Sequence, residues 1–233
     1  MILSPRSFPG RTGIGVRIAV VDSGIHAAHP HVGGVAGGVS IGPAGEIGED
    51  FADRLGHGTA VAAAIREKAP DCELLAVKVF DRSLMTTGQA LVAAIEWAAQ
   101  QRVQLINLSL GTTNQEHAQA FAAAIAHAGE CGTIVVSAAP QEDAPWLPGG
   151  LPGVIAVDVD WDCPRDECCV VAADDASIRL SASGYPRPIP GIPVERNFSG
   201  LSFAVANATG LLAQMFEDQA TQTFMSLAQG LRT

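Results

Sequence analysis

The chain has 233 residues, of which 48% are hydrophobic and 16% are charged, enough for one large apolar core. Its formal net charge is −10 and it contains no cluster of Lys and Arg, so nucleic acid is not an expected partner. Its apolar runs are short and bounded by Gly, Pro or Asp, so the sequence predicts neither a membrane-spanning segment nor a membrane partner.

The first twelve residues lack the composition of a secretory signal. They contain two Arg and two Pro, and no apolar run of the length that a signal peptide needs. The chain has five cysteines, and an odd number without a signal indicates free thiols rather than a disulfide framework. We therefore expect a cytoplasmic protein.

Apolar β-branched runs alternate with helical patterns along the chain. The first run, residues 16–21, is continuous and leads into Asp22-Ser23-Gly24, which is typical of a strand buried on both faces of a parallel sheet. The expected strands are 16–21, 74–79, 103–108, 133–136 and 154–159, and the expected helices are 59–67, 89–100, 115–128 and 202–216. This alternation predicts right-handed βαβ units, and hence an α/β fold of three layers with a mostly parallel central sheet flanked by helices.

Residues 161–197 break this pattern. They contain five prolines, and we expect loops there with one or two short strands. No linker of low hydrophobicity divides the chain, so residues 1–233 are predicted to form one domain, with about 1–15 as an N-terminal extension and no recognisable prodomain.

Three cysteines, Cys163, Cys168 and Cys169, lie close together in this irregular region. A zinc site is one interpretation, but the spacing is not that of two ligand pairs and no fourth ligand is evident. Reduced thiols in a loop are the simpler interpretation, so we expect no metal and no other cofactor.

Three short segments carry the residue types that acyl transfer requires. Asp22 closes a buried strand, His57 opens a helix between two glycines, and Ser202 opens the last long helix. A serine hydroxyl becomes a good nucleophile when an imidazole takes its proton, and a carboxylate holds that imidazole in the right tautomer. The carboxyl ends of parallel strands meet at one edge of a sheet, which would bring such segments together.

Each of these residues also has a simpler interpretation. Asp22 could form a turn, His57 could merely pack between glycines, and Ser202 could be a plain N-cap. The chain has further histidines that we interpret as surface or turn residues, namely His26, His29, His31, His117 and His127. The joint context of one strand end and two helix starts favours the catalytic interpretation.

The motifs around these residues resemble those of the subtilisin family of serine peptidases, the subtilases. The residues that carry the resemblance are Asp22-Ser-Gly24, His57-Gly-Thr59, Gly200-Leu-Ser-Phe-Ala204, Leu75-Ala-Val-Lys-Val79 and Ile106-Asn-Leu-Ser-Leu-Gly111. The similarity extends from about Arg17 to Ala213. It implies a subtilisin-like fold and a serine endopeptidase with the triad Asp22, His57 and Ser202.

The resemblance also implies where an extended peptide substrate would bind. Ser109, Leu110 and Gly111 match the segment that pairs with the substrate backbone and walls the first specificity pocket. Leu84, Met85 and Thr86 fall where the opposite pairing edge is expected.

Several positions depart from the family pattern. Gln141 stands where the family has its oxyanion-binding Asn, and it either donates to the oxyanion or only fills space. The following loop is short, so Trp146 either narrows the first pocket or packs outside the fold. The calcium-binding insertion that many relatives carry after the first helix is missing, so we expect no calcium there.

These departures leave two other functions open. One is a catalytically weak or inactive peptide-binding module. The other is a selective intracellular peptidase that processes one peptide, for example by removing a leader segment.

Overall fold

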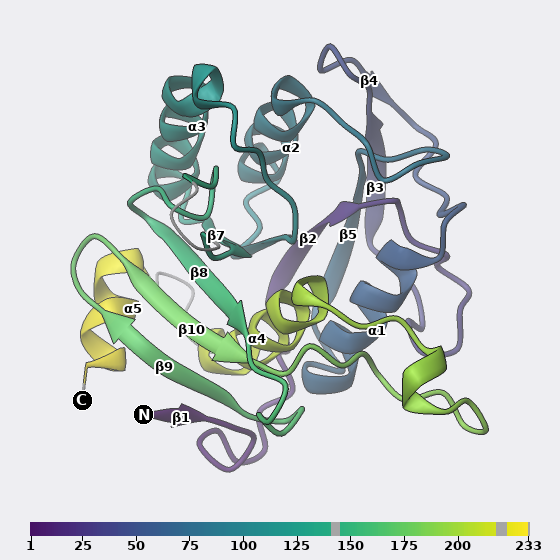
Figure 1. Ribbon diagram of the computed structural model, residues 1–233, viewed down its shortest axis with the longest axis vertical. Helices are drawn as coiled ribbons and strands as arrows, with labels where there is room; N and C mark the ends of the chain where they lie inside the picture. Colours follow the sequence, from purple (N-terminus) through teal and green to yellow (C-terminus); the bar gives the residue numbers. More distant parts are fainter. Residues whose placement is uncertain (141–144, 218–222, 233) are drawn as a thin grey trace.

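A ten-stranded sheet runs through the molecule in the order β1-β9-β10-β8-β7-β6-β2-β5-β3-β4 (Figure 1). The computed structural model describes residues 1–140, 145–217 and 223–232. The strands are β1 (Ile2–Leu3), β2 (Arg17–Asp22), β3 (Gly37–Ile41), β4 (Ile47–Gly48), β5 (Glu73–Lys78), β6 (Leu105–Leu108), β7 (Ile134–Ala138), β8 (Val154–Val159), β9 (Cys168–Ala173) and β10 (Ile178–Ala182). The pairs from β3 across to β10 are parallel, and the antiparallel pairs of these described strands lie at the two edges.

Helices cover both faces of this sheet. They are α1 (His57–Lys68), α2 (Gly88–Gln100), α3 (Ala118–Glu130), α4 (Leu201–Phe216) and α5 (Phe224–Leu231), with 3-10 turns at Gln115–His117 and Val194–Arg196. Helices α2 and α3 lie on one face, and α1, α4 and α5 lie on the other (Figure 1). The three-layer α/β fold with a mostly parallel sheet is therefore confirmed. Within the described ranges, no helix combines the length and apolar character needed to cross a bilayer.

Side chains of β2 alternate between the two apolar cores that these layers enclose. Ile18 and Val20 pack in the core shared with α1 and α4, whereas Ala19 and Val21 pack in the core shared with α2 and α3. Successive side chains of a strand point to opposite faces, so a strand between two helical layers must be apolar at every position. This is why residues 18–21, which are fully buried in the strand, are all apolar.

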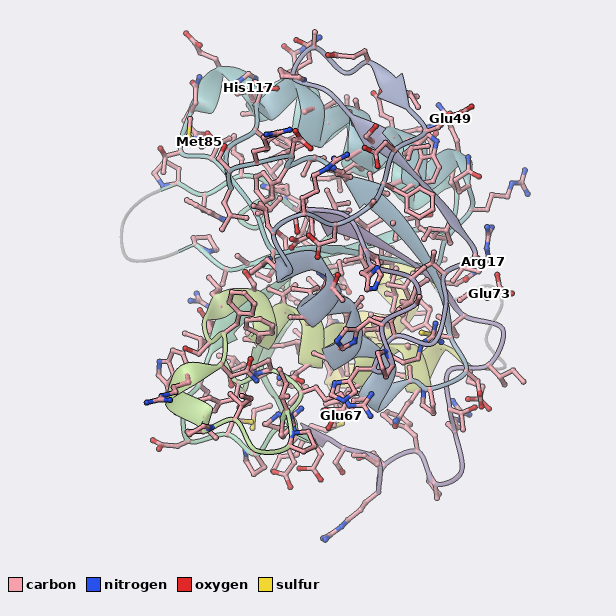
Figure 2. The ribbon with its side chains drawn as sticks, turned by 90° about the vertical axis from the view of Figure 1, so that its right-hand side faces the viewer. Arg17, Glu49, Glu67, Glu73, Met85 and His117 are labelled. Carbon is pink, nitrogen blue, oxygen red and sulfur yellow. The ribbon has the colours of Figure 1, made fainter. Side chains whose placement is uncertain are left out.

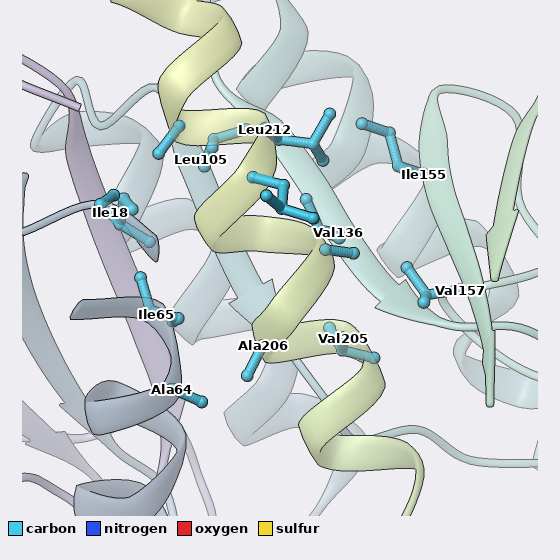
Figure 3. Close-up of a cluster of buried hydrophobic side chains, with 14 of the residues drawn as sticks. Ile18, Ala64, Ile65, Leu105, Val136, Ile155, Val157, Val205, Ala206 and Leu212 are labelled. Atoms are coloured by element: carbon cyan, nitrogen blue, oxygen red, sulfur yellow. The ribbon is translucent and has the colours of Figure 1, made fainter. Parts of the chain in front are cut away.

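Helix α4 is the central element of the first core. Figure 3 shows its Val205, Ala206 and Leu212 among the side chains of α1 and of the sheet. Of its 16 residues, 13 are buried, which explains why its sequence is apolar on nearly every side. The first turn of α4, which contains Ser202, is therefore held by a helix that has little freedom to shift.

The region 161–197 contains more regular structure than five prolines suggest. β9 and β10 form an antiparallel hairpin at the end of the parallel sheet, and β1 adds to β9, with Ile2 opposite Cys169. The first residues of the chain thus belong to the sheet. Helix α5, which packs against β9, was not expected from the sequence.

Cys168 and Cys169 lie on β9 rather than in a loop, because they pair with β1 and β10. All five cysteines are free thiols, as the odd count predicted. Burial raises the pKa of Cys163 to about 12 and raises that of Cys168 as well, which makes both thiols poor metal ligands and poor nucleophiles. In the described part of the chain, no group of three His, Cys, Asp or Glu side chains is arranged to hold a metal ion.

Candidate active site

The central strand β2 lies between β5 and β6, where the strand order of the parallel sheet reverses. Open α/β sheets bind ligands at the carboxyl end of the strands at such a switch point. Asp22 is the last residue of β2 and is fully buried. The topology thus places this carboxylate at the position in the sheet where a site is expected.

Asp22 holds His57, the first residue of α1. The Nδ1 atom of His57 lies 2.8 Å from Oδ1 and 3.0 Å from Oδ2 of Asp22, and Oδ1 also accepts the backbone N–H of Ser23. Burial acts to lower the pKa of His57, but the hydrogen bond and negative charge of Asp22 outweigh it and raise that pKa above its usual value of 6.5. This is the geometry in which a carboxylate orients an imidazole and stabilises its protonated form.

Gly58 allows α1 to begin directly against the end of β2. A Cβ atom at Gly58 would lie 2.2 Å from the carbonyl oxygen of Gly24 and 3.1 Å from Cβ of Asp22. Such contacts are too short for any side chain, so only glycine lets the helix approach this closely. The glycine after His57 is therefore a steric requirement of the Asp22–His57 contact.

Asp53 fixes the approach to α1 from the other side. Its carboxylate accepts five hydrogen bonds, from Ser23 Oγ, the backbone N–H groups of Leu55 and Gly56, and both N–H and Oγ1 of Thr59. Burial acts to raise the pKa of Asp53, but these hydrogen bonds outweigh it and hold the pKa below its usual range. Asp53 thus ties the end of β2 to the first turn of α1.

Ser202 is the second residue of α4, and the residue that follows it packs against the His57 ring. The ring of its neighbour Phe203 lies 5.7 Å from that of His57, and Gly200 caps the helix with a φ of 142°. The first N–H groups of a helix have no partner within the helix, so the Ser202 N–H is positioned to serve an oxyanion. No hydrogen bond joins Ser202 Oγ to His57 among the described side chains, and such bonds are often long before substrate binds.

A chain of buried and partly buried hydrogen bonds links β6 to α4. Thr209 Oγ1 donates to Asn107 Oδ1 at 3.0 Å, Asn107 Nδ2 donates to Ser109 Oγ at 3.3 Å, and Ser109 Oγ donates to the Ser202 carbonyl at 3.3 Å. The family resemblance implies that Ser109 lies beside the substrate. The structure brings it into direct contact with the backbone of Ser202.

The two expected substrate-pairing segments both follow strands at this end of the sheet. Ser109, Leu110 and Gly111 directly follow β6 and are half-buried. Leu84 and Met85 lie in an irregular segment between β5 and α2, with exposed fractions of 58% and 79%, and Met85 lies at the rim of the molecule (Figure 2). Both segments have the accessibility that backbone pairing with a peptide requires.

Trp146 packs on Gly111. A Cβ atom at Gly111 would lie 2.3 Å from the indole Nε1, and the backbones of Thr112 and Leu147 form a bridge beside it with two hydrogen bonds of 2.9 Å. The indole N–H is buried, and no described residue accepts a hydrogen bond from it. Trp146 therefore packs inside the fold against the segment that the resemblance assigns to the first pocket, rather than on its outer surface.

Gln141, the expected oxyanion donor, lies outside the described residues, and its role stays a prediction. Asp53 was not among the predicted site residues, although an Asp shortly before a helix start is a common capping signal. His29 and His31, predicted as surface or turn residues, lie in the turns after β2 and also line a cavity that includes Gly56, the residue before His57.

Solved structures with a similar fold include sphericase, with a TM-score of 0.71 at 23% identity over 94% of this chain and 83% of that one. A cold-adapted subtilisin-like serine proteinase has a TM-score of 0.72 at 23% identity, over 94% of this chain and 82% of that one.

Curated relatives are more similar in sequence. The thermostable alkaline protease of Halalkalibacterium halodurans is 31% identical over 219 residues, covering 87% of this chain and 55% of the relative. Subtilisin Savinase of Lederbergia lenta is 31% identical over 215 residues, covering 87% of this chain and 73% of the relative. The chain thus spans about half the length of the first of these relatives. Residues 13–229 match the model of the subtilase family, and the chain belongs to that family.

Proposed function

We propose that this protein is a serine endopeptidase in which Ser202 attacks the carbonyl carbon of a peptide bond. His57 takes the hydroxyl proton and later gives it to the leaving amine, while Asp22 orients His57. The backbone N–H of Ser202 holds the oxyanion, together with the Gln141 carboxamide. An acyl-enzyme forms on Ser202, and water then releases it.

The observation that carries this proposal is the 2.8 Å contact between Asp22 and His57 beside the first turn of α4. A buried carboxylate on an imidazole could serve structure alone. Here the imidazole is only partly buried, with 14% of its side chain exposed, and the N-terminus of a helix that carries a serine lies beside it. Membership of the subtilase family supports the same roles.

The substrate in this proposal is an extended peptide that pairs with residues 109–111 on one side and 84–86 on the other. Trp146 occupies space beside Gly111, so the residue before the cleaved bond is small, such as Gly or Ala. A narrow first pocket favours a selective peptidase over a broad one.

We further propose that the protein acts in the cytoplasm on a small set of peptides, for example in the removal of a leader. Five free thiols, three of them with pKa values that burial raises, support a reducing compartment. The restricted first pocket supports a narrow range of substrates.

A fluorophosphonate probe tests the catalytic assignment. Intact-mass spectrometry of the wild type should show one adduct on Ser202, and Ser202→Ala and His57→Ala should show none. The absence of any adduct on the wild type between about pH 6 and 9 would reject the endopeptidase and leave the peptide-binding module.

A further inference from the structure

A cavity of about 360 Å³ opens beside the first turns of α1, next to the residue that precedes His57. The loop after β2, the first two turns of α1 and the segment before α4 form its walls. Its lining includes Gly56, which precedes His57, and Phe198, whose ring lies 6.0 Å from the His57 ring in an edge-on arrangement. A volume of this size admits a side chain with part of its backbone.

The position of this cavity indicates that it contacts the part of the substrate after the cleaved bond. Neither residues 109–111 nor residues 84–86 contribute to its lining. In the proposed reaction His57 returns its proton to the leaving amine, so the residues after the cleaved bond pass beside His57. The cavity is therefore on the path of the leaving peptide.

Among the described residues, Arg187 is a cation of this cavity that has no ion-pair partner. No carboxylate that the structure describes forms an ion pair with its guanidinium, which donates one hydrogen bond to the His31 carbonyl at 3.2 Å. Its side chain is half-buried, and its backbone carbonyl accepts a hydrogen bond from Asn197. Arg187 therefore presents a fixed positive charge to the cavity.

The described acidic groups near Arg187 already have partners. Asp53 lines the cavity, but it accepts five hydrogen bonds from the protein itself. Arg54 is paired with Asp50 and Asp81, and Glu67 is paired with Lys68 and Arg165. No carboxylate among these is available to neutralise Arg187.

Three histidines, His26, His29 and His31, complete the polar lining. Burial lowers the pKa of His31, and the charges of Arg187 and His29 lower it further, which is the effect of a positive local potential. The remaining walls are apolar and include Ala60, Ala63 and Ile189. An occupant with an apolar stem and a negative end fits both parts of this lining.

We propose that this cavity is a recognition subsite for a glutamate or aspartate on the leaving side of the cleaved bond, and that Arg187 selects it. The inference rests on the peptidase function proposed above. A charge-assisted hydrogen bond between a guanidinium and a carboxylate supplies the selectivity.

Paired peptides test the subsite. Internally quenched peptides carry either Glu or Gln at the first, second or third position after the cleaved bond. The wild type should cleave the Glu peptide with a kcat/KM about five- to tenfold above that of the Gln peptide at one of these positions. Arg187→Gln should reduce this ratio to about one with little change for the Gln peptide, and Arg187→Glu should instead favour Lys.

Arg196→Gln is the matched control, since it removes an exposed charge from the same segment outside the cavity lining and should keep the ratio. Arg187→Lys keeps the charge and should keep part of the preference. In the wild type itself, raising NaCl from about 50 to 500 mM should reduce the ratio, which tests the charge without any substitution.

Two results would overturn the subsite: equal rates for Glu and Gln at all three positions, or an unchanged ratio in Arg187→Gln. If the protein is not a peptidase, the result is distinguishable from these two, because the wild type would then cleave neither peptide and form no fluorophosphonate adduct. In that case the binding of the same peptide pairs to Ser202→Ala, measured by fluorescence anisotropy, still decides whether the cavity prefers Glu.

Discussion

At the scale of single residues, the Asp22 carboxylate controls the protonation of His57. His57 must be neutral to accept the Ser202 proton, and its pKa is raised in the folded protein. Activity is therefore expected to fall as the pH drops through a value above 6.5. The acid limb of a kcat/KM profile measures this value directly.

Asp22→Asn should move that acid limb to lower pH and reduce kcat by about 10⁴-fold, because the amide removes the negative charge and favours the wrong imidazole tautomer. The control is Asp162→Asn, which removes an exposed carboxylate and should leave the profile unchanged. An unshifted acid limb in Asp22→Asn would mean that another group sets it.

Trp146 determines the space beside Gly111. Trp146→Ala should raise kcat/KM for substrates with Leu or Phe before the cleaved bond relative to those with Ala, and should cost about 3 kcal/mol of unfolding free energy. Trp146→Phe keeps a ring and removes the unpaired N–H, so the preference for Ala should persist in it. If Trp146→Ala kept the wild-type preference, the indole would not limit the pocket.

A local sequence motif predicts the position of a site residue well when the motif is specific to one local structure. Asp22 and His57 lie together as their positions at a strand end and a helix start predicted. Arg187 could not be predicted in the same way. Its significance depends on the lack of a partner across a cavity whose walls come from three distant segments, and no local pattern encodes that.

At the scale of elements, the start of α1 depends on how closely it approaches β2. Gly58→Ala would force a methyl group onto the Gly24 carbonyl, so it should destabilise the protein by about 1–3 kcal/mol and lower kcat by displacing His57. Urea unfolding and kcat measure the two effects.

Gly129→Ala is the matched control within α3, where a new Cβ would meet no atom within 4 Å. It should stabilise the protein by up to about 1 kcal/mol, because alanine favours a helix over glycine. A Gly58→Ala variant with wild-type stability and kcat would show that α1 tolerates displacement from β2.

Helices and strands with a clear pattern of apolar residues were predicted from the sequence. Elements that form only because they pair with another strand were not. Strand β2 and helix α4 stand out because most of their residues are apolar and buried. Strand β1 consists of two residues and exists because it pairs with β9. Such short edge strands carry no periodic signal of their own, because tertiary contacts stabilise them.

At the scale of the whole molecule, α1 leads into β5 through only four residues, 69–72, which leaves no room for an inserted ion-binding loop. We therefore expect dialysis against EDTA to leave the melting temperature unchanged, and millimolar calcium to leave it unchanged as well. A fall of several degrees on chelation, restored by calcium, would contradict this expectation.

The parallel sheet and its two helical layers follow from the order of apolar runs, because few other topologies satisfy right-handed crossovers. The cavity beside His57 follows from how the loop after β2 meets the segment before α4. These segments are more than 150 residues apart in the sequence, and their contact depends on side-chain packing rather than on pattern.

The hydrogen bonds from Thr209 through Asn107 and Ser109 to the Ser202 carbonyl have a mechanical consequence. They return from the third turn of α4 to its first turn by way of β6, and so form a closed loop of restraints. A peptide backbone docked against Ser109 would shift together with the nucleophile whenever the sheet twists. The attack distance would then change little under thermal motion, although the strands and helices themselves move.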